Sequence, residues 1–84
     1  MNLGDTVKSI SSKEDLIKFI GELRMDFNNN SSTWENSSLE SYLAAMQSWL
    51  EDIEGWAENS NLDISRITSW ELIGHILFAS KMYE

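Results

Sequence analysis

The chain has 84 residues, of which 42% are hydrophobic, no cysteine, and a formal net charge of −8. This length makes one small domain with enough apolar residues for a core, which excludes a disordered tail, and the lack of cysteine excludes disulfides, thiol catalysis and cysteine-based zinc sites. The negative charge, all of it carried by residues 25–84, repels nucleic acid and anionic membranes, so we expect neither as a partner.

The first ten residues are expected to form a loosely ordered N-terminal arm. They lack the basic-then-apolar layout of a secretion signal. No apolar run in the chain approaches the ~20 residues that a membrane-spanning helix needs. We therefore expect a cytoplasmic protein.

The first helix is predicted over about residues 13–27. Two serines, Ser11 and Ser12, stand before Glu14 and Asp15 in a capping-box pattern, which favours a helix start at this point. Five apolar residues then fall on one helical face. They are Leu16, Phe19, Ile20, Leu23 and Phe27.

The second helix is predicted over about residues 38–58, after a polar loop of asparagine, serine and threonine at 28–33. Ser37 and Glu40 provide its capping box. Gly55 lies inside the helix, where glycine costs ~1 kcal/mol relative to alanine. We expect the helix to continue through Gly55, because the apolar pattern resumes beyond it.

The last helix is predicted over about residues 69–83, with Thr68 and Glu71 as a third capping box. Its residues are apolar on nearly every side, which is typical of the most buried helix in a domain. The sequence therefore predicts one all-α domain over 1–84, made of three helices with the last one most buried.

An acidic row follows one flank of the second helix. Glu51, Glu54 and Glu58 are three or four residues apart, with no lysine or arginine among them. Like charges at this spacing repel each other, and the helix dipole disfavours anions near a C-terminus. We interpret the row as a surface for a basic protein partner. A solvated face that only keeps the protein soluble is the alternative.

An aromatic row lies on the other flank of the same helix. Tyr42, Trp49 and Trp56 repeat every seven residues, so they share one side. Aromatic stripes at helical spacing usually belong to a core. The alternative is a row at the edge of the core that docks a partner, because tryptophan and tyrosine dominate binding hot spots.

The residues that carry catalysis or metal binding are not assembled in this sequence. His75 has only Glu71 at helical spacing, and a metal needs three or four ligands. The stretch from Asp26 to Ser37 imitates a calcium loop but lacks the glycine at its sixth position and the glutamate at its twelfth. We therefore predict no catalytic residue, no metal and no cofactor, and a protein that is not an enzyme.

A set of spaced residues carries a resemblance to a known family. They read Trp34-Glu35-Asn36, Leu39-Glu40-x-Tyr42-Leu43-x-Ala45-Met46-x-x-Trp49-Leu50-x-Asp52, Ser69-Trp70 and Ile76-Leu77-x-Ala79-x-x-Tyr83-Glu84. In this pattern the chain resembles a family of small uncharacterised bacterial proteins, over most of its length from Ile10 onward. The resemblance implies an independent small helical domain and no particular reaction.

Three residues of this pattern are further candidates for partner binding: Trp34, Glu35 and Asp52. Each also has a structural interpretation. Trp34 precedes a capped helix and can fold back onto the core as a staple, and the polar residues beside it can cap the helix. Asp52 lies beside the tryptophan edge and can accept a bond from an indole N–H or another buried donor.

These observations together predict a non-catalytic, acidic protein-interaction domain. An inhibitor or an immunity-type partner that covers a basic site on another protein would fit this size and charge. The alternative is a homo-oligomeric structural or adaptor module, for example a homodimer. In that case apolar surface left over on the last helix, including Phe78 and Met82, would mediate self-association.

Overall fold

The computed structural model describes residues 3–83, and every regular element in this range is helical, without a strand. The elements are α1 (Leu3–Val7), α2 (Lys13–Asn30), α3 (Leu39–Glu51), α4 (Ile53–Asn59) and α5 (Ser69–Ser80), with short 3-10 helices η1 (Ser31–Thr33) and η2 (Ile64–Arg66). The all-α class is confirmed. The count of three helices is wrong, because the N-terminal segment adds one helix and a break in the second predicted helix adds another.

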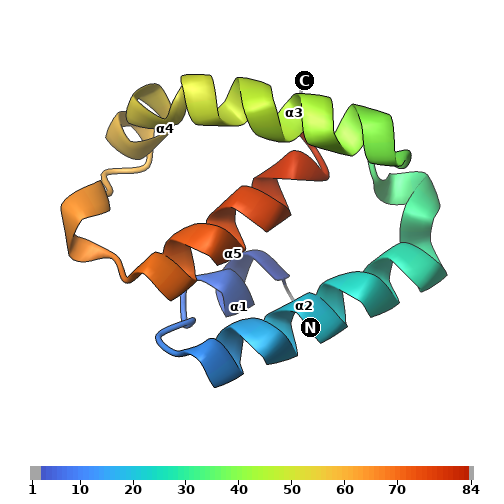
Figure 1. Ribbon diagram of the computed structural model, residues 1–84, viewed down its shortest axis with the longest axis horizontal. Coiled ribbons are helices and arrows are strands. Elements are labelled where there is room, and N and C mark those ends of the chain that lie inside the picture. Colours follow the sequence, from blue (N-terminus) through green and yellow to red (C-terminus); the bar gives the residue numbers. More distant parts are fainter. Residues whose placement is uncertain (1–2, 84) are drawn as a thin grey trace.

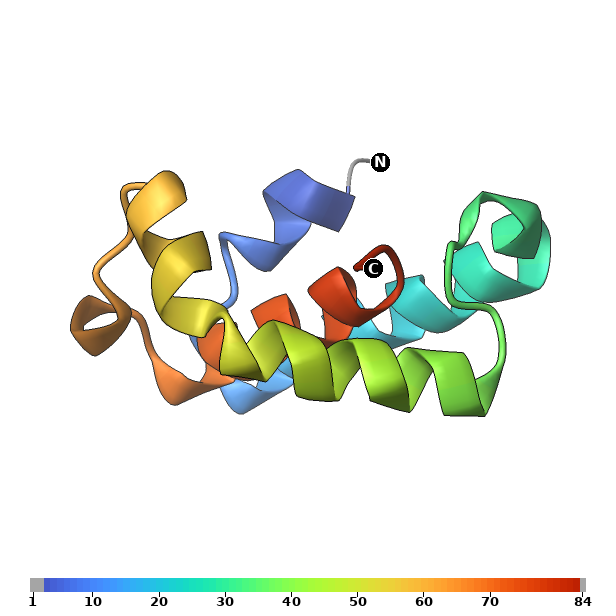
Figure 2. The ribbon, with the colours of Figure 1, turned by 90° about the horizontal axis from the view of Figure 1, so that it is seen from above.

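The helices form a thin molecule, with Cα extents of 33 × 27 × 17 Å. α5 lies between α2 and α3, and these three helices make a layer (Figure 1). α1 lies on one face of that layer, while no helix of the described chain lies on the opposite face (Figure 2). α5 contacts α1, α2 and α3, so the last helix is central, as its composition predicts.

The buried apolar cluster comes from α1, α2 and the segment between them. The buried apolar cluster consists of Val7, Ile10, Leu16, Phe19 and Leu23. α5 adds the partly buried Leu77 and Phe78, and its Ile73 is 39% exposed. Taken as a whole, α5 is nevertheless the least exposed of the three long helices, as predicted. Three of its twelve residues are exposed, against eleven of eighteen in α2 and eight of thirteen in α3.

The N-terminal segment is packed, contrary to the loose arm expected over residues 1–10. Within its described part, α1 is helical, and Val7 and Ile10 are each only 2% exposed. Both side chains lie against α5 at Gly74, where a Cβ atom would come within 2.5 Å of Ile10 Cδ1 and 3.1 Å of Val7 Cγ2. The glycine thus allows α1 to approach α5 closely.

Gly74→Ala is expected to destabilise the protein by about 1 kcal/mol. Overpacking costs about 1–3 kcal/mol, and the better helix propensity of alanine offsets about 1 kcal/mol of it. Adding Ile10→Val removes the clashing Cδ1 atom. The double variant should therefore be more stable than the sum of the two single effects predicts. Urea unfolding of the four proteins measures this coupling. Strictly additive effects would show that α1 does not press on Gly74.

α2 begins where predicted and ends three residues later than predicted. The Ser12 hydroxyl caps the helix by accepting from the Asp15 N–H at 3.1 Å, which confirms this start. At the other end, residues 28–30 are helical rather than part of a loop. Asn30 donates from its side chain to Asp26 Oδ1 at 3.4 Å, and its carbonyl accepts from the Thr33 hydroxyl at 2.7 Å.

The predicted helix over 38–58 is broken at Asp52, and Gly55 lies inside α4. Asp52 has φ −104° and ψ 13°, and its N–H bonds to the Trp49 carbonyl at 3.1 Å, a tight turn rather than a helical bond. The capping residues at the start are Ser38 and Ser41 instead of Ser37 and Glu40. The expectation of one continuous helix is therefore wrong. The turn at Asp52 gives α4 a different direction from α3.

α5 starts at the predicted cap and ends at Ser80 rather than at 83. The Thr68 hydroxyl accepts from the Glu71 N–H at 3.0 Å. At the C-terminal end Asn36 bonds to the last residue of the helix and to the chain beyond it, with its side-chain amide donating to the carbonyls of Ser80 (3.0 Å) and Tyr83 (2.7 Å). Asn36 therefore caps α5, while Ser38 caps the start of α3. No helix in the described range is long and apolar enough to span a membrane.

Candidate partner-binding site

A hollow of about 550 Å³ opens at the turn between α3 and α4. Three aromatic rings and three carboxylates share its lining, with Gly55 and Asn59 completing it. The rings are those of Trp49, Trp56 and Tyr83, and the carboxylates are those of Glu51, Asp52 and Glu54. We call this site the acidic hollow.

The tryptophan side of the acidic hollow is fixed by ring contacts. Trp49 is only 3% exposed, and its ring lies 5.0 Å from that of Trp56, centroid to centroid. Residues seven apart on a straight helix are separated by about 10 Å along the axis, so the turn at Asp52 helps to bring the two rings together. Trp56 in turn lies 5.0 Å from the ring of His75, which meets Glu71 at 2.9 Å through its Nε2 atom.

The tyrosine side of the acidic hollow is held by Asp52. The Tyr83 hydroxyl donates a hydrogen bond to Asp52 Oδ2. This bond raises the pKa of Tyr83, and desolvation and the negative charges of Asp52 and Glu51 raise it further. The phenol therefore stays neutral and bonded at physiological pH. Asp52 accepts from a hydroxyl here, whereas the sequence predicted an indole or another buried donor.

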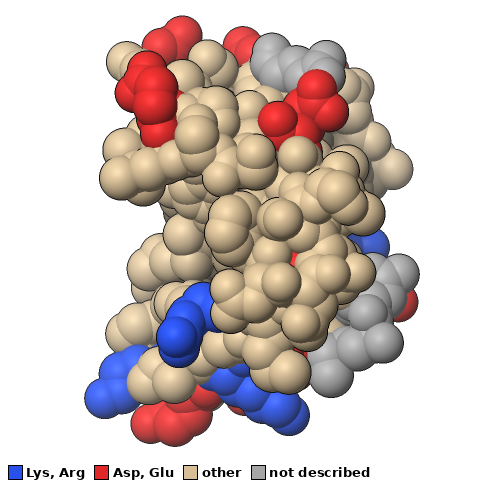
Figure 3. Space-filling model, turned by 90° about the vertical axis from the view of Figure 1, so that its right-hand side faces the viewer, with Lys and Arg blue, Asp and Glu red and all other residues tan. Residues whose placement is uncertain are grey.

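The acidic row lies at this end of the molecule, although the turn divides it. Glu51, Glu54 and Glu58 are all exposed, and the first two line the acidic hollow while Glu58 does not. Within the described residues, none of the three forms an ion pair with a lysine or arginine. Seen from the opposite end of the layer, where the chain passes from α2 to α3, the part over α3 also shows acids without bases, and bases gather towards α2 (Figure 3).

Trp34 and Glu35 lie at the other end of α3 from the acidic hollow (Figure 1). The Trp34 indole N–H donates to Asp26 Oδ2 at 2.7 Å, and the Lys81 ammonium donates to the same oxygen at 2.9 Å. The ammonium also lies 5.1 Å from the centroid of the Trp34 ring. Trp34 thus joins α2 to the end of α5, and Glu35 is exposed beside it.

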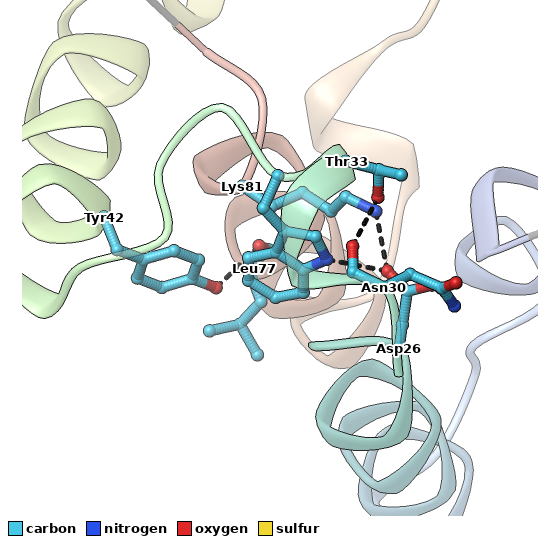
Figure 4. Close-up of polar contacts among 7 residues, drawn as sticks. Asp26, Asn30, Thr33, Tyr42, Leu77 and Lys81 are labelled. Atoms are coloured by element: carbon cyan, nitrogen blue, oxygen red, sulfur yellow. Dashed lines mark hydrogen bonds and ion pairs between the residues drawn. The ribbon is translucent and has the colours of Figure 1, made fainter. Parts of the chain in front are cut away.

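Tyr42 belongs with Trp34 rather than with the other two residues of the aromatic row. Its ring stacks on that of Trp34 at 6.0 Å, and its hydroxyl donates to the Leu77 carbonyl at 2.7 Å (Figure 4). Burial raises the pKa of Tyr42 to about 12. The aromatic row therefore splits into a structural residue and the two tryptophans of the acidic hollow.

The Asp26 carboxylate is the part of this structure that sequence reasoning interpreted least well. The sequence suggested it only as the first residue of an imperfect calcium loop. In the structure the Lys81 ammonium and the Trp34 indole both donate hydrogen bonds to this carboxylate, and these bonds lower the pKa of Asp26. Across the described residues, no group of three or more histidine or acidic side chains is arranged to hold a metal.

The surface predicted for self-association on the last helix is mostly covered. His75 is buried, and Phe78 packs against the core cluster. Met82 is exposed. The side of α5 that carries Glu71, His75 and Phe78 faces α1 and α4, where all three residues line a hollow together with Val7 and Trp56. Apolar surface for a second copy must therefore be sought elsewhere.

Comparison with known proteins relates this chain to a protein family. A family model described as a family of unknown function (DUF7660) matches residues 12–84. No curated protein and no solved structure matches the chain. The resemblance to a family without an assigned activity is thereby confirmed.

Proposed function

We propose that this chain, which belongs to the DUF7660 family of unknown function, is a non-catalytic acidic domain that binds a basic protein partner through the acidic hollow. The partner would present a lysine or arginine side chain as an anchor. An inhibitor or immunity-type protein that covers a basic site on its target is one form of this function.

One observation carries the proposal: the three aromatic rings and the three carboxylates line the same hollow. A long basic side chain has an apolar stem and a charged head, so it needs both kinds of surface. Rings such as those of Trp56 and Tyr83 would contact the stem and attract the cation through their faces. Glu51 and Glu54 would accept charge-assisted hydrogen bonds from the head. An acidic surface that served only solubility would not require aromatic rings between its carboxylates.

The remaining candidates take different parts in this proposal. Asp52 positions Tyr83 and adds negative charge to the acidic hollow. Glu58 would contribute to electrostatic steering of a basic partner rather than to the anchor contact. Trp34 has its structural bonds to Asp26 and Lys81 already, so it is not included in the binding surface.

An arginine peptide tests the proposed function directly. Gly-Arg-Gly amide is expected to shift the indole N–H signals of Trp49 and Trp56 in a ¹⁵N NMR titration. The same peptide with citrulline in place of arginine should not, because citrulline has the same shape without the charge. In the variant Glu51→Gln/Glu54→Gln the affinity for the arginine peptide should fall about tenfold, which corresponds to ~1.4 kcal/mol.

A matched control separates the acidic hollow from net charge. Glu14→Gln/Glu40→Gln removes the same number of charges at exposed positions outside the lining of the hollow. This control variant should bind the peptide like the unmodified protein, and both variants should keep their melting temperatures. Equal weakening in both variants would assign the effect to net charge and would refute a specific site. Absence of any shift with the arginine peptide would do the same.

A further inference from the structure

An apolar face on the side of the layer opposite to α1 has no cover within the described chain (Figure 2). Six large apolar side chains from α2 and α3 are between 36% and 74% exposed. They are Ile17, Ile20 and Phe27 on α2, and Leu39, Leu43 and Leu50 on α3. We call this surface the open face. Exposed apolar surface of this extent on a small domain marks an interaction site.

The three helices of the layer share the open face. Ile20 and Phe27 of α2 line one hollow of about 470 Å³ together with Leu77 of α5 and Tyr42 of α3. Phe27 also lines a second hollow together with Leu39. Met25, by contrast, lies on the α1 side of α2, where it lines a hollow with Leu3. Through these two hollows the apolar surface of α2, at Ile20 and Phe27, continues to Leu39 of α3.

Charged residues border the open face at matching intervals. On α2, Lys13 and Arg24 are eleven residues apart, and on α3, Glu40 and Glu51 are also eleven residues apart. Eleven residues make three turns and rise about 16 Å, so each pair points to one side of its helix and both pairs have the same span. All four are exposed, and none of them forms an ion pair within the described residues.

The bases lie in the apolar sector of α2, and the acids flank the apolar strip of α3. At about 100° per residue, Lys13 and Arg24 fall between the directions of Phe27 and Ile17. Glu40 and Glu51 follow the strip of Leu39, Leu43 and Leu50 on its outer side. The open face therefore has a basic border on one helix and an acidic border on the other.

We propose that a second copy of this chain docks on the open face, related by a two-fold axis that lies along the layer between α2 and α3. α2 and α3 run in opposite directions on the two sides of α5 (Figure 1). Rotation about that axis places α2 of one copy on α3 of the other. The N-terminal end of α2 then lies at the C-terminal end of α3. Lys13 then meets Glu51 of the second copy, and Arg24 meets Glu40 of the second copy. Because the operation is two-fold, four such pairs form, and the apolar strips meet between them.

The dimensions of the molecule suit such a dimer. The layer measures 33 × 27 Å between Cα atoms, so one face offers on the order of 800 Å², the area that a partner buries in a stable interface. A second copy supplies apolar surface of the same shape as well as the complementary border. Glu51 belongs both to this border and to the acidic hollow, whereas Lys13, Arg24 and Glu40 lie outside the lining of the hollow. The variant Lys13→Glu/Arg24→Glu therefore tests the dimer without changing the hollow.

Sedimentation equilibrium of charge-reversal variants tests the proposal. The unmodified protein should be a dimer at micromolar concentration. Lys13→Glu/Arg24→Glu gives a chain with two acidic borders, and Glu40→Lys/Glu51→Lys gives a chain with two basic borders. Each variant alone should dissociate at least about 100-fold more easily, because like charges then meet across the axis. All four positions are exposed, so both variants should keep the circular dichroism of the folded protein.

The decisive measurement is a mixture of the two variants, which should restore a one-to-one dimer. Both variants remain net negative, so net charge does not drive their association. A protein that stays monomeric at millimolar concentration would overturn the proposal and leave the open face to a different partner. Variants that still dimerise alone, or a mixture that does not associate, would overturn it as well. Glu54→Gln/Glu58→Gln, which changes acids outside the border, should leave the dimer intact.

Discussion

Asp26→Ala is expected to lower the free energy of unfolding by about 3–5 kcal/mol, because it leaves the buried ammonium of Lys81 without a counter-charge. Lys81 is only 8% exposed, and its side chain meets Asp26 Oδ2 at 2.9 Å. The same oxygen accepts from the Trp34 indole at 2.7 Å, so the substitution also removes the partner of that donor. One carboxylate thus satisfies two groups from distant parts of the chain.

Urea unfolding at neutral pH measures this loss, and two further variants define its origin. In Asp26→Ala/Lys81→Met the unpaired charge is gone, so the double variant should recover part of the stability lost in the single one. Asp63→Ala is the matched control. Asp63 pairs with Arg66 at 3.7 Å on the surface, where both side chains are more than half exposed, and it caps η2 by accepting from the Ser65 N–H. Its loss should therefore cost only about 0.5–2 kcal/mol. Equal effects of the two single substitutions would contradict a buried pair.

The pH dependence of stability gives the same pair a second signature. Hydrogen bonds from Lys81 and then from Trp34 lower the pKa of Asp26 in the folded protein. A carboxyl with a lowered folded pKa contributes stability above its unfolded pKa, which is near 3.9, and loses it as the pH falls through the folded value. The unmodified protein should therefore lose stability below about pH 4 more steeply than Asp26→Asn.

Phe19→Ala is expected to cost about 3–5 kcal/mol, a large part of the stability of a domain this small. The Phe19 side chain has no exposed surface and lies at the centre of the cluster formed by α1 and α2. Removal of its ring leaves a cavity between the two helices. Thermal and urea unfolding measure the loss. Met25→Ala on the same helix is the control, because Met25 is 63% exposed and should matter by less than about 0.5 kcal/mol.

Features of the fold that depend on neighbouring residues were predictable from the sequence. The starts of α2 and α5 follow from Ser12 and Thr68, whose hydroxyls cap the N–H groups three residues later. A local hydrogen bond of this kind needs no knowledge of the rest of the chain. The helical class and the central place of α5 followed for the same reason, from periodicity within each segment.

The features that the sequence did not reveal depend on residues far apart in the chain. The turn at Asp52 accompanies a bond to Tyr83, which is 31 positions later. Asn36 caps the end of a helix that begins more than thirty residues beyond it. Val7 and Ile10 are buried because Gly74 leaves room for them. In each case the local pattern favoured another structure, and a tertiary contact decided the outcome.

The candidate site was predictable in part for the same reasons. The acids Glu51 and Glu54 stood out as an uncompensated row, and both line the acidic hollow. Tyr83 did not stand out, because only the folded chain brings it to the turn. The aromatic row led to the opposite error. Its regular spacing grouped Tyr42 with two tryptophans, although Tyr42 does not line the acidic hollow with them.

The central place of α5 has a consequence for the order of events during synthesis. α5 is the last of the described helices to leave the ribosome, yet it contacts α1, α2 and α3. Until it arrives, Val7 and Ile10 have no Gly74 to pack on, and α2 and α3 lack the helix that joins them. The apolar side chains that pack on α5 therefore stay accessible to chaperones and proteases until α5 has been synthesised. We expect the layer to be completed only when α5 docks between α2 and α3.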